Sequence, residues 1–158
     1  MGQGLSVKCN KCGYDFDAWL GIGMLFPNLY KENVKKMKRG ELGTEAKAFF
    51  EKYPNGVINS EQAVSKCTKC GNYDVVDDFT MYMPKDGVTV PDEVAYILAE
   101  EIKESYVKYM DYPHKCSKCG GRSKVYKSFE KKAYKGELKC PKCDGFMMIN
   151  PVQMIMWD

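Results

Sequence analysis

The feature that most constrains this chain is a motif that occurs four times, Lys-Cys-x-Lys-Cys. It is KCNKC at 8–12, KCTKC at 66–70, KCSKC at 115–119 and KCPKC at 139–143, and these four copies contain all eight cysteines. A C-x-x-C turn directs two sulfurs toward one centre, and two such turns supply the four thiolates of a tetrahedral structural zinc site. The sequence therefore predicts two zinc ions per chain. The expected ligands are Cys9, Cys12, Cys67, Cys70, Cys116, Cys119, Cys140 and Cys143.

Spacing suggests how the four pairs divide between the two ions. The pairs Cys116/Cys119 and Cys140/Cys143 are separated by residues 120–139, which is near the upper end of the spacing typical of a zinc ribbon. We therefore expect a C-terminal ribbon. By elimination, the pairs at 9/12 and 67/70 would share the other ion across a long insertion. An interleaved pairing stays open at this point.

The fold expected around these pairs is α+β. Apolar residues at helical spacing in 29–37, and again after Thr44, predict two helices between the first two pairs. Alternating Phe79, Met81 and Met83 predict a strand, and the apolar stripe from Val94 to Tyr106 predicts a third helix that begins near Pro91. The expected division is an N-terminal knuckle domain with a helical insertion at 1–84, a connecting helix at 85–111 and a C-terminal zinc ribbon at 112–158.

The same residues argue against catalysis. Four cysteines close the coordination shell of zinc, whereas catalytic zinc keeps an open position. The chain has a single histidine, His114, and the Gly21-Ile22-Gly23 segment lacks the third glycine of a dinucleotide loop. A thioredoxin-like centre would need one C-x-x-C rather than four matched copies. We expect a protein that is not an enzyme.

Cysteine usage also bears on the compartment. An even number of cysteines in a small secreted protein can indicate disulfides, but the sequence begins MGQGLSVKC, without an apolar run of signal-peptide length. No window reaches the apolar length of a membrane span. We therefore expect a cytoplasmic protein without a membrane partner, in which paired C-x-x-C motifs bind metal.

Lysines flank every cysteine pair. Four thiolates around a dication leave a formal charge of minus two per site, which is costly to bury without compensation. Lysines at the rim would offset this charge, or they would simply keep exposed knuckle tips soluble. The eight are Lys8, Lys11, Lys66, Lys69, Lys115, Lys118, Lys139 and Lys142.

The remaining charge is distributed unevenly. Residues 74–111 hold ten acidic and three basic side chains, net −7, whereas 112–143 hold ten basic and two acidic, net +8. Basic residues interleaved with aromatic ones, here in an expected hairpin at 122–135, suit contact with nucleic acid. The candidate contacts are Arg122, Lys124, Tyr126, Lys127, Phe129, Lys131, Lys132 and Lys135. The alternatives are a solvated face, or docking onto the acidic segment of the same chain or of a second copy in a homodimer.

The knuckles resemble those of the zinc-ribbon and rubredoxin-like superfamily, and CNKCGYDFD resembles the first knuckle of a rubredoxin. The fuller pattern, CGYDFDAWLGIGMLFPNLY with CTKCGN and HKCSKCGG, is similar to small bacterial double-knuckle zinc proteins, a resemblance that implies no activity. We expect a zinc-stabilised binding or adaptor protein with a protein or nucleic-acid partner. The alternatives are a nucleic-acid-binding zinc ribbon and a rubredoxin-like iron protein that transfers electrons.

Overall fold

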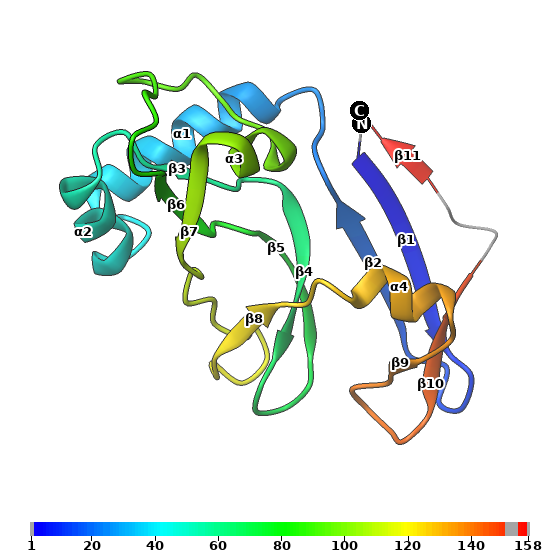
Figure 1. Ribbon diagram of the computed structural model, residues 1–158. Helices are drawn as coiled ribbons and strands as arrows, with labels where there is room; N and C mark the ends of the chain where they lie inside the picture. Colours follow the sequence, from blue (N-terminus) through cyan, green and yellow to red (C-terminus); the bar gives the residue numbers. More distant parts are fainter. Residues whose placement is uncertain (1, 151–154, 158) are drawn as a thin grey trace. The chain divides into compact units, whose positions relative to one another are not determined.

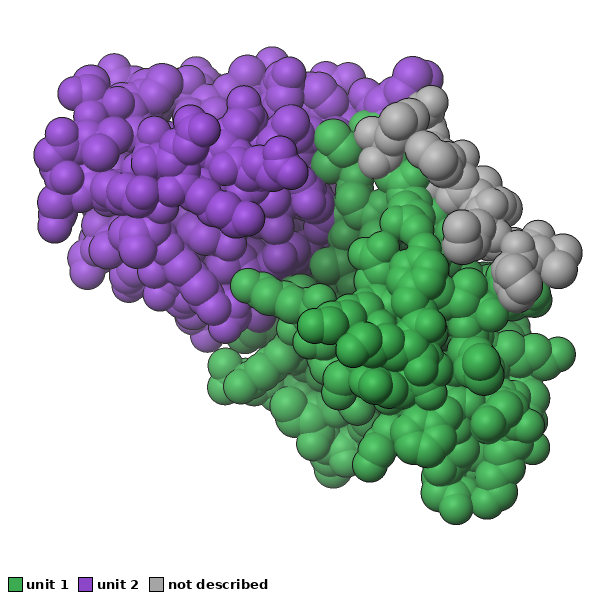
Figure 2. Space-filling view, turned by 45° about the vertical axis from the view of Figure 1, so that its right-hand side comes forward, with its two compact units in different colours: residues 1–23, 62–76, 113–158 green, residues 24–61, 77–112 purple. Residues whose placement is uncertain are grey.

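The computed structural model of this protein describes residues 2–150 and 155–157, and it is an α+β structure, as the sequence predicts. The chain divides into two compact units, which Figure 1 shows as ribbons and Figure 2 in separate colours. Unit 1 comprises Met1–Gly23, Gln62–Val76 and Pro113–Asp158, and unit 2 comprises Met24–Glu61 and Asp77–Tyr112.

This division differs from the expected blocks at 1–84, 85–111 and 112–158. Each unit is assembled from segments that are distant in sequence, so the chain passes between the units at residues 23/24, 61/62, 76/77 and 112/113. The segments carrying the four cysteine pairs all belong to unit 1. The expected consecutive blocks are wrong because cysteine segments that are distant in the sequence come together in unit 1. The residues between them, 24–61 and 77–112, form unit 2.

Strand β1 (Gly2–Cys9) is central to unit 1. Along one edge it pairs antiparallel with β2 (Asp15–Leu20), from Gln3 opposite Leu20 to Lys8 opposite Asp15. Its other edge pairs with β10 (Phe146–Ile149) and with β11 (Ile155–Trp157), and β10 continues the sheet to β9 (Leu138–Lys139). A separate sheet has the order β5-β4-β8, where the strands span Tyr73–Asp77, Gln62–Cys67 and Ser123–Val125.

One apolar core joins both sheets of unit 1. Leu5 and Val7 of β1 pack in a cluster with Val64 and Tyr73 of the second sheet. The short helix α4 (Phe129–Tyr134) contributes Phe129 and Ala133, and Cys9 and Cys140 belong to the same cluster. The Tyr73 hydroxyl donates a hydrogen bond of 2.9 Å to the carbonyl oxygen of Lys139. The segments around the first, second and fourth cysteine pairs thus contribute to a common core.

Unit 2 holds two of the expected helices, α1 (Phe26–Arg39) and α2 (Thr44–Lys52). Helix α1 ends where Gly40 adopts φ 82°, a left-handed conformation that glycine reaches without strain. A three-stranded sheet has the order β3-β6-β7, with strands at Val57–Ile58, Met81–Pro84 and Tyr106–Met110. The predicted strand around Met81 is confirmed, although Phe79 lies before it with φ 56°.

The third helix is much shorter than the sequence predicts. Helix α3 spans only Ala99–Ser105, and Tyr106 begins β7. Residues 91–98 are not helical, so Pro91 does not open the helix. Of the apolar stripe, Ile102 is buried in α3, while Tyr106 is buried as a strand residue. Sheet pairing of 106–110 with β6 overrides the local helical pattern.

In the part of the chain that the structure describes, no helix combines the length and apolarity that a membrane crossing requires.

Helix α1 offers a test of its own packing. Met37 is fully buried, whereas Leu29, which the sequence pattern placed on the same stripe, is 48% exposed. Met37→Ala is expected to lower the free energy of unfolding by about 2 to 5 kcal/mol, because it removes a packed side chain and leaves a cavity. The matched change Leu29→Ala should shift it by less than about 0.5 kcal/mol. Chemical denaturation of the metal-loaded protein measures both, and equal effects would contradict this packing.

Candidate metal centres

The eight cysteines come together as two groups of four. The outer cluster is Cys9, Cys12, Cys140 and Cys143, and the inner cluster is Cys67, Cys70, Cys116 and Cys119; within each, all four Sγ atoms lie within 4.8 Å of one another. Facing sulfurs are 3.6 Å apart in the pairs Cys9–Cys143 and Cys12–Cys140. In the inner cluster, Cys67–Cys119 and Cys70–Cys116 are 3.5 and 3.6 Å apart.

This pairing corrects the one expected from spacing. The last two cysteine pairs do not form a C-terminal ribbon together, and the first two do not share an ion. The chain instead uses a nested pairing, in which the first pair faces the fourth and the second faces the third, so neither the ribbon pairing nor an interleaved pairing is present. The facing cysteines are 134 and 128 positions apart in the outer cluster and 52 and 46 apart in the inner one.

Each cluster has dimensions that suit a tetrahedral metal ion. Zinc–sulfur bonds of about 2.3 Å in a tetrahedron place the sulfurs about 3.8 Å apart. The observed separations of 3.5 to 3.6 Å between facing sulfurs are close to this value. The free cysteines form no disulfide among the described residues. The structure therefore supports two four-cysteine metal sites in unit 1.

The same backbone turn builds all four knuckles. In each, the N–H of the first cysteine donates to the carbonyl oxygen five residues later, which folds the C-x-x-C segment back on itself. These bonds are 2.7 to 2.9 Å long. They join Cys9 to Tyr14, Cys67 to Asn72, Cys116 to Gly121 and Cys140 to Gly145.

Backbone amides also point at the sulfurs. The N–H groups of Lys11, Lys69 and Lys142 donate to the sulfur two residues earlier, at 3.3 to 3.4 Å. Hydrogen bonds from the amides of Cys12 and Lys11 lower the pKa of the Cys9 thiol to about 6, against burial, which raises it. Amides of Cys70 and Lys69 do the same for Cys67. One thiol of each cluster is thus prepared to lose its proton.

Two other thiols, Cys143 and Cys70, lose their protons less easily. The Gly145 amide favours ionisation of Cys143, but burial and the neighbouring thiols Cys12 and Cys9 raise its pKa to about 12. The pKa of Cys70 is also raised. Four thiolates this close repel one another unless a cation lies between them. A bound dication would remove that repulsion, which is why the donor set fits a metal ion.

Glycines allow these knuckles to form and to approach one another. Gly13, Gly71 and Gly120 follow the second cysteine of three knuckles, and their φ values of 71°, 73° and 66° lie in the left-handed region that glycine adopts without strain. In the fourth knuckle, Asp144 does not adopt a positive φ. Gly145 instead allows the first and fourth knuckles to approach each other, because a Cβ at this position would lie 2.8 Å from Lys11 Cβ and 3.0 Å from Cys9 Sγ.

Gly121 has the equivalent role in the inner cluster, which the sequence prediction did not include. A Cβ at this position would lie 3.2 Å from Cys119 Sγ and 3.2 Å from Lys69 Cβ. The sequence signal was present, since glycine stands two residues after the last cysteine in both the third and fourth knuckles. The reason that a side chain is excluded at Gly121 and Gly145 becomes clear only from the structure, in which the second knuckle lies against the third and the first against the fourth.

Three of the knuckle lysines have specific neighbours. Lys11 forms an ion pair with Asp144 across the outer cluster. Lys142 Nζ lies 4.6 Å from the ring centroid of Tyr14, and Lys66 Nζ lies 5.5 and 5.2 Å from those of Tyr73 and Tyr126. These contacts hold the lysine stems at the rim of the knuckles; charge compensation of the metal by the eight lysines stays a prediction.

The candidate nucleic-acid-binding residues do not lie on the hairpin that the sequence predicted. Segment 122–135 is strand β8 followed by helix α4, and Phe129 is 2% exposed in the core of unit 1, so its ring is not available to stack on a base. Tyr126 and Lys132 are half-buried. The exposed members are Arg122, Lys124, Lys127, Lys131 and Lys135.

No family model, no curated protein and no solved structure matches this chain. The likeness to zinc-ribbon and rubredoxin-like knuckles thus depends on the cysteine segments, whose two clusters are compatible with zinc-knuckle sites.

The pairing can be tested by replacing Cys9 and Cys12 together with serine. The variant should lose one of two metal ions, and Cys140 and Cys143 should then react with an alkylating reagent, because their coordination partners are gone. Cys67, Cys70, Cys116 and Cys119 should stay protected. Peptide mass spectrometry after alkylation reads out each position, and protection of 140/143 together with labelling of 67/70 would show that the pairing is wrong.

Proposed function

We propose that this chain is a zinc-stabilised, non-enzymatic binding protein whose two metal ions cross-link the segments of unit 1. The proposal depends on the geometry of the two clusters, in each of which the four cysteine sulfurs lie within 4.8 Å of one another. An all-sulfur tetrahedral donor set suits zinc, and a shell of four protein ligands leaves no position for a substrate. The metal therefore contributes folding energy rather than catalysis.

The magnitude of this contribution supports a structural role. Binding of structural zinc contributes roughly 10 to 16 kcal/mol in zinc-finger peptides, which is comparable with the total stability of a domain, about 5 to 15 kcal/mol. In unit 1 the ligands Cys9 and Cys140 are themselves core residues, exposed by 3% and 7%. Removal of the metal would therefore place unpaired thiols in the apolar core.

A non-catalytic role also accords with the position of the single histidine. His114 is 7% exposed and its carbonyl oxygen accepts the Ser123 amide, so it is part of the backbone pairing next to the third knuckle. It is not among the residues of either four-cysteine cluster. A buried imidazole in this position suits a structural role.

Metal content tests the proposal and its iron alternative. Protein purified without added metal should contain two zinc ions per chain by elemental analysis and should be colourless. Chelation under reducing conditions should unfold unit 1, because the eight cysteines then lose the two ions that cross-link the four knuckles. A red, iron-containing protein that undergoes reversible one-electron reduction would favour the rubredoxin-like alternative, and native circular dichroism after complete metal removal would contradict a structural role.

A second candidate function, nucleic-acid binding, is favoured by an arrangement that the sequence did not show. Lys66 of β4 lies directly opposite Lys124 of β8, and Lys115 lies opposite Arg122 in a neighbouring bridge. Like charges facing each other across strands are destabilising. Among residues 2–150, no carboxylate forms an ion pair with these four side chains.

An aromatic ring lies within this basic surface. Lys66 Nζ and Lys132 Nζ lie 5.2 and 5.7 Å from the ring centroid of Tyr126, which stacks beside Tyr73 at 6.2 Å. Closely spaced cations around an aromatic ring fit a polyanion with stacking bases, such as single-stranded RNA or DNA. The surface is made of β4, β8 and α4, so it includes Lys66 from outside the stretch expected from sequence.

A charge-reversal variant at Lys124 distinguishes an effect on nucleic-acid binding from an effect on stability. Lys124→Glu should raise the free energy of unfolding by about 0.2 to 1 kcal/mol, because it converts a repulsive pair with Lys66 into an attractive one. The same change should weaken binding of labelled oligo(U) and oligo(dT), and it should reduce the salt slope by about 0.7 for each phosphate that the side chain neutralises. Lys47→Glu on α2 is the control and should leave binding unchanged. Fluorescence anisotropy at several salt concentrations measures this, and undiminished binding by Lys124→Glu would exclude the surface.

A further inference from the structure

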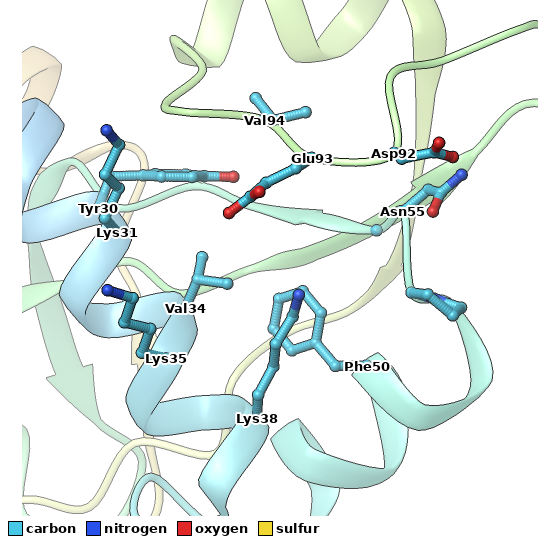
Figure 3. A pocket seen from close by; sticks show the side chains of 12 residues that line it. Tyr30, Lys31, Val34, Lys35, Lys38, Phe50, Asn55, Asp92, Glu93 and Val94 are labelled. Atoms are coloured by element: carbon cyan, nitrogen blue, oxygen red, sulfur yellow. The ribbon is translucent and has the colours of Figure 1, made fainter.

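Unit 2 contains a cavity of about 260 Å³ that neither metal site uses. It lies between helix α1, residue Phe50 of α2, the Pro54–Gly56 turn and the segment Asp92–Val94, and Figure 3 shows the side chains that line it. Ligand pockets for drug-sized molecules measure roughly 300 to 1,000 Å³. This cavity therefore suits a molecule of amino-acid size.

One wall of the cavity is cationic. Lys31, Lys35 and Lys38 occur at helical spacing on the same face of α1, and all three are exposed. Like charges three and four residues apart repel each other and destabilise a helix. On the same helix, Lys36 by contrast pairs with Glu32, and on α2 Lys47 pairs with Glu51. The three lysines that line the cavity form no ion pair among the described residues.

The facing wall is anionic. Asp92 and Glu93 line the cavity on the segment opposite α1 (Figure 3), and neither forms an ion pair with the lysines within the described part of the chain. Between the two walls lie apolar surfaces of Val34 and Phe50, with Lys38 Nζ 5.4 Å from the Phe50 ring centroid. The cavity thus presents separated charges of both signs on either side of an apolar surface.

We propose that this cavity binds a small zwitterion, an amino acid with an apolar side chain. Its carboxylate would meet the lysines of α1, its ammonium group would meet Asp92 and Glu93, and its side chain would contact Val34 and Phe50. A simple anion would leave the acidic wall without a partner, and a simple amine would leave the lysines repelling one another. Binding at this site is independent of the cysteines, since unit 2 contains none of them.

The probe is L-phenylalanine, titrated into the ¹⁵N-labelled, zinc-loaded full chain and followed by NMR chemical shifts. Saturable shifts should be confined to the backbone amides of α1, of Asn55 and Gly56, and of Asp92–Val94. N-acetyl-L-phenylalanine lacks the ammonium group and L-phenylalaninamide lacks the carboxylate. Each analogue should bind at least about ten times more weakly, because one wall loses its partner.

Variants locate the site. The double variant Lys35→Gln, Lys38→Gln should weaken L-phenylalanine at least about tenfold, and Glu93→Gln should weaken it while leaving N-acetyl-L-phenylalanine unaffected. Lys47→Gln, on α2 outside the cavity, is the matched control and should bind as the original chain does. No saturable shifts up to the solubility limit, equal binding of the N-acetyl analogue, or unchanged binding by both cavity variants would each overturn the proposal.

Discussion

The arrangement of unit 1 centres on two four-cysteine clusters, each of which joins two knuckles that are far apart in the chain. The outer cluster joins the turn after β1 to the turn after β9, and the inner cluster joins the turn after β4 to the segment before β8. Because the pairing is nested, the inner cluster closes a shorter loop within the longer loop of the outer cluster. Cys9 and Cys140 connect the outer site directly to the apolar core that both sheets share. Coordination and apolar burial therefore support the same arrangement of strands.

This arrangement explains how one chain can hold a cysteine-free unit between its knuckles. Unit 2 is formed by two insertions, at Met24–Glu61 and Asp77–Tyr112, and it has its own helices and sheet. Its core residues, such as Tyr30, Phe49 and Met81, are buried without help from a metal. One unit thus carries both four-cysteine clusters and the basic surface on β4, β8 and α4. The other unit is stabilised by apolar packing and contains the mixed-charge cavity. This separation is what would allow a binding role for each unit.

Some local predictions were right because they depend on few residues. Helices α1 and α2 follow from apolar residues at helical spacing in 29–37 and after Thr44. Other predictions were wrong at positions where contacts with residues distant in the sequence determine the local structure. Only Ile102 of the stripe from Val94 to Tyr106 is helical, and Tyr106 belongs to β7 because β6 pairs with 106–110. Phe129 was placed on a surface by its basic neighbours, but a six-residue helix turns its ring into the core.

The sequence by itself determined the eight ligands, since four C-x-x-C motifs with no other cysteine leave no further choice. It also determined that the donors are thiolates, and hence the class of metal ion that suits them. Only the tertiary structure decided which knuckles face each other. Loop-closure entropy makes the longer outer loop only about 1.5 kcal/mol less favourable than the short ribbon loop, which is small beside roughly 10 to 16 kcal/mol of zinc binding. Spacing is therefore a weak guide to pairing, and the shared core of β1, β4, β5 and α4 decides it.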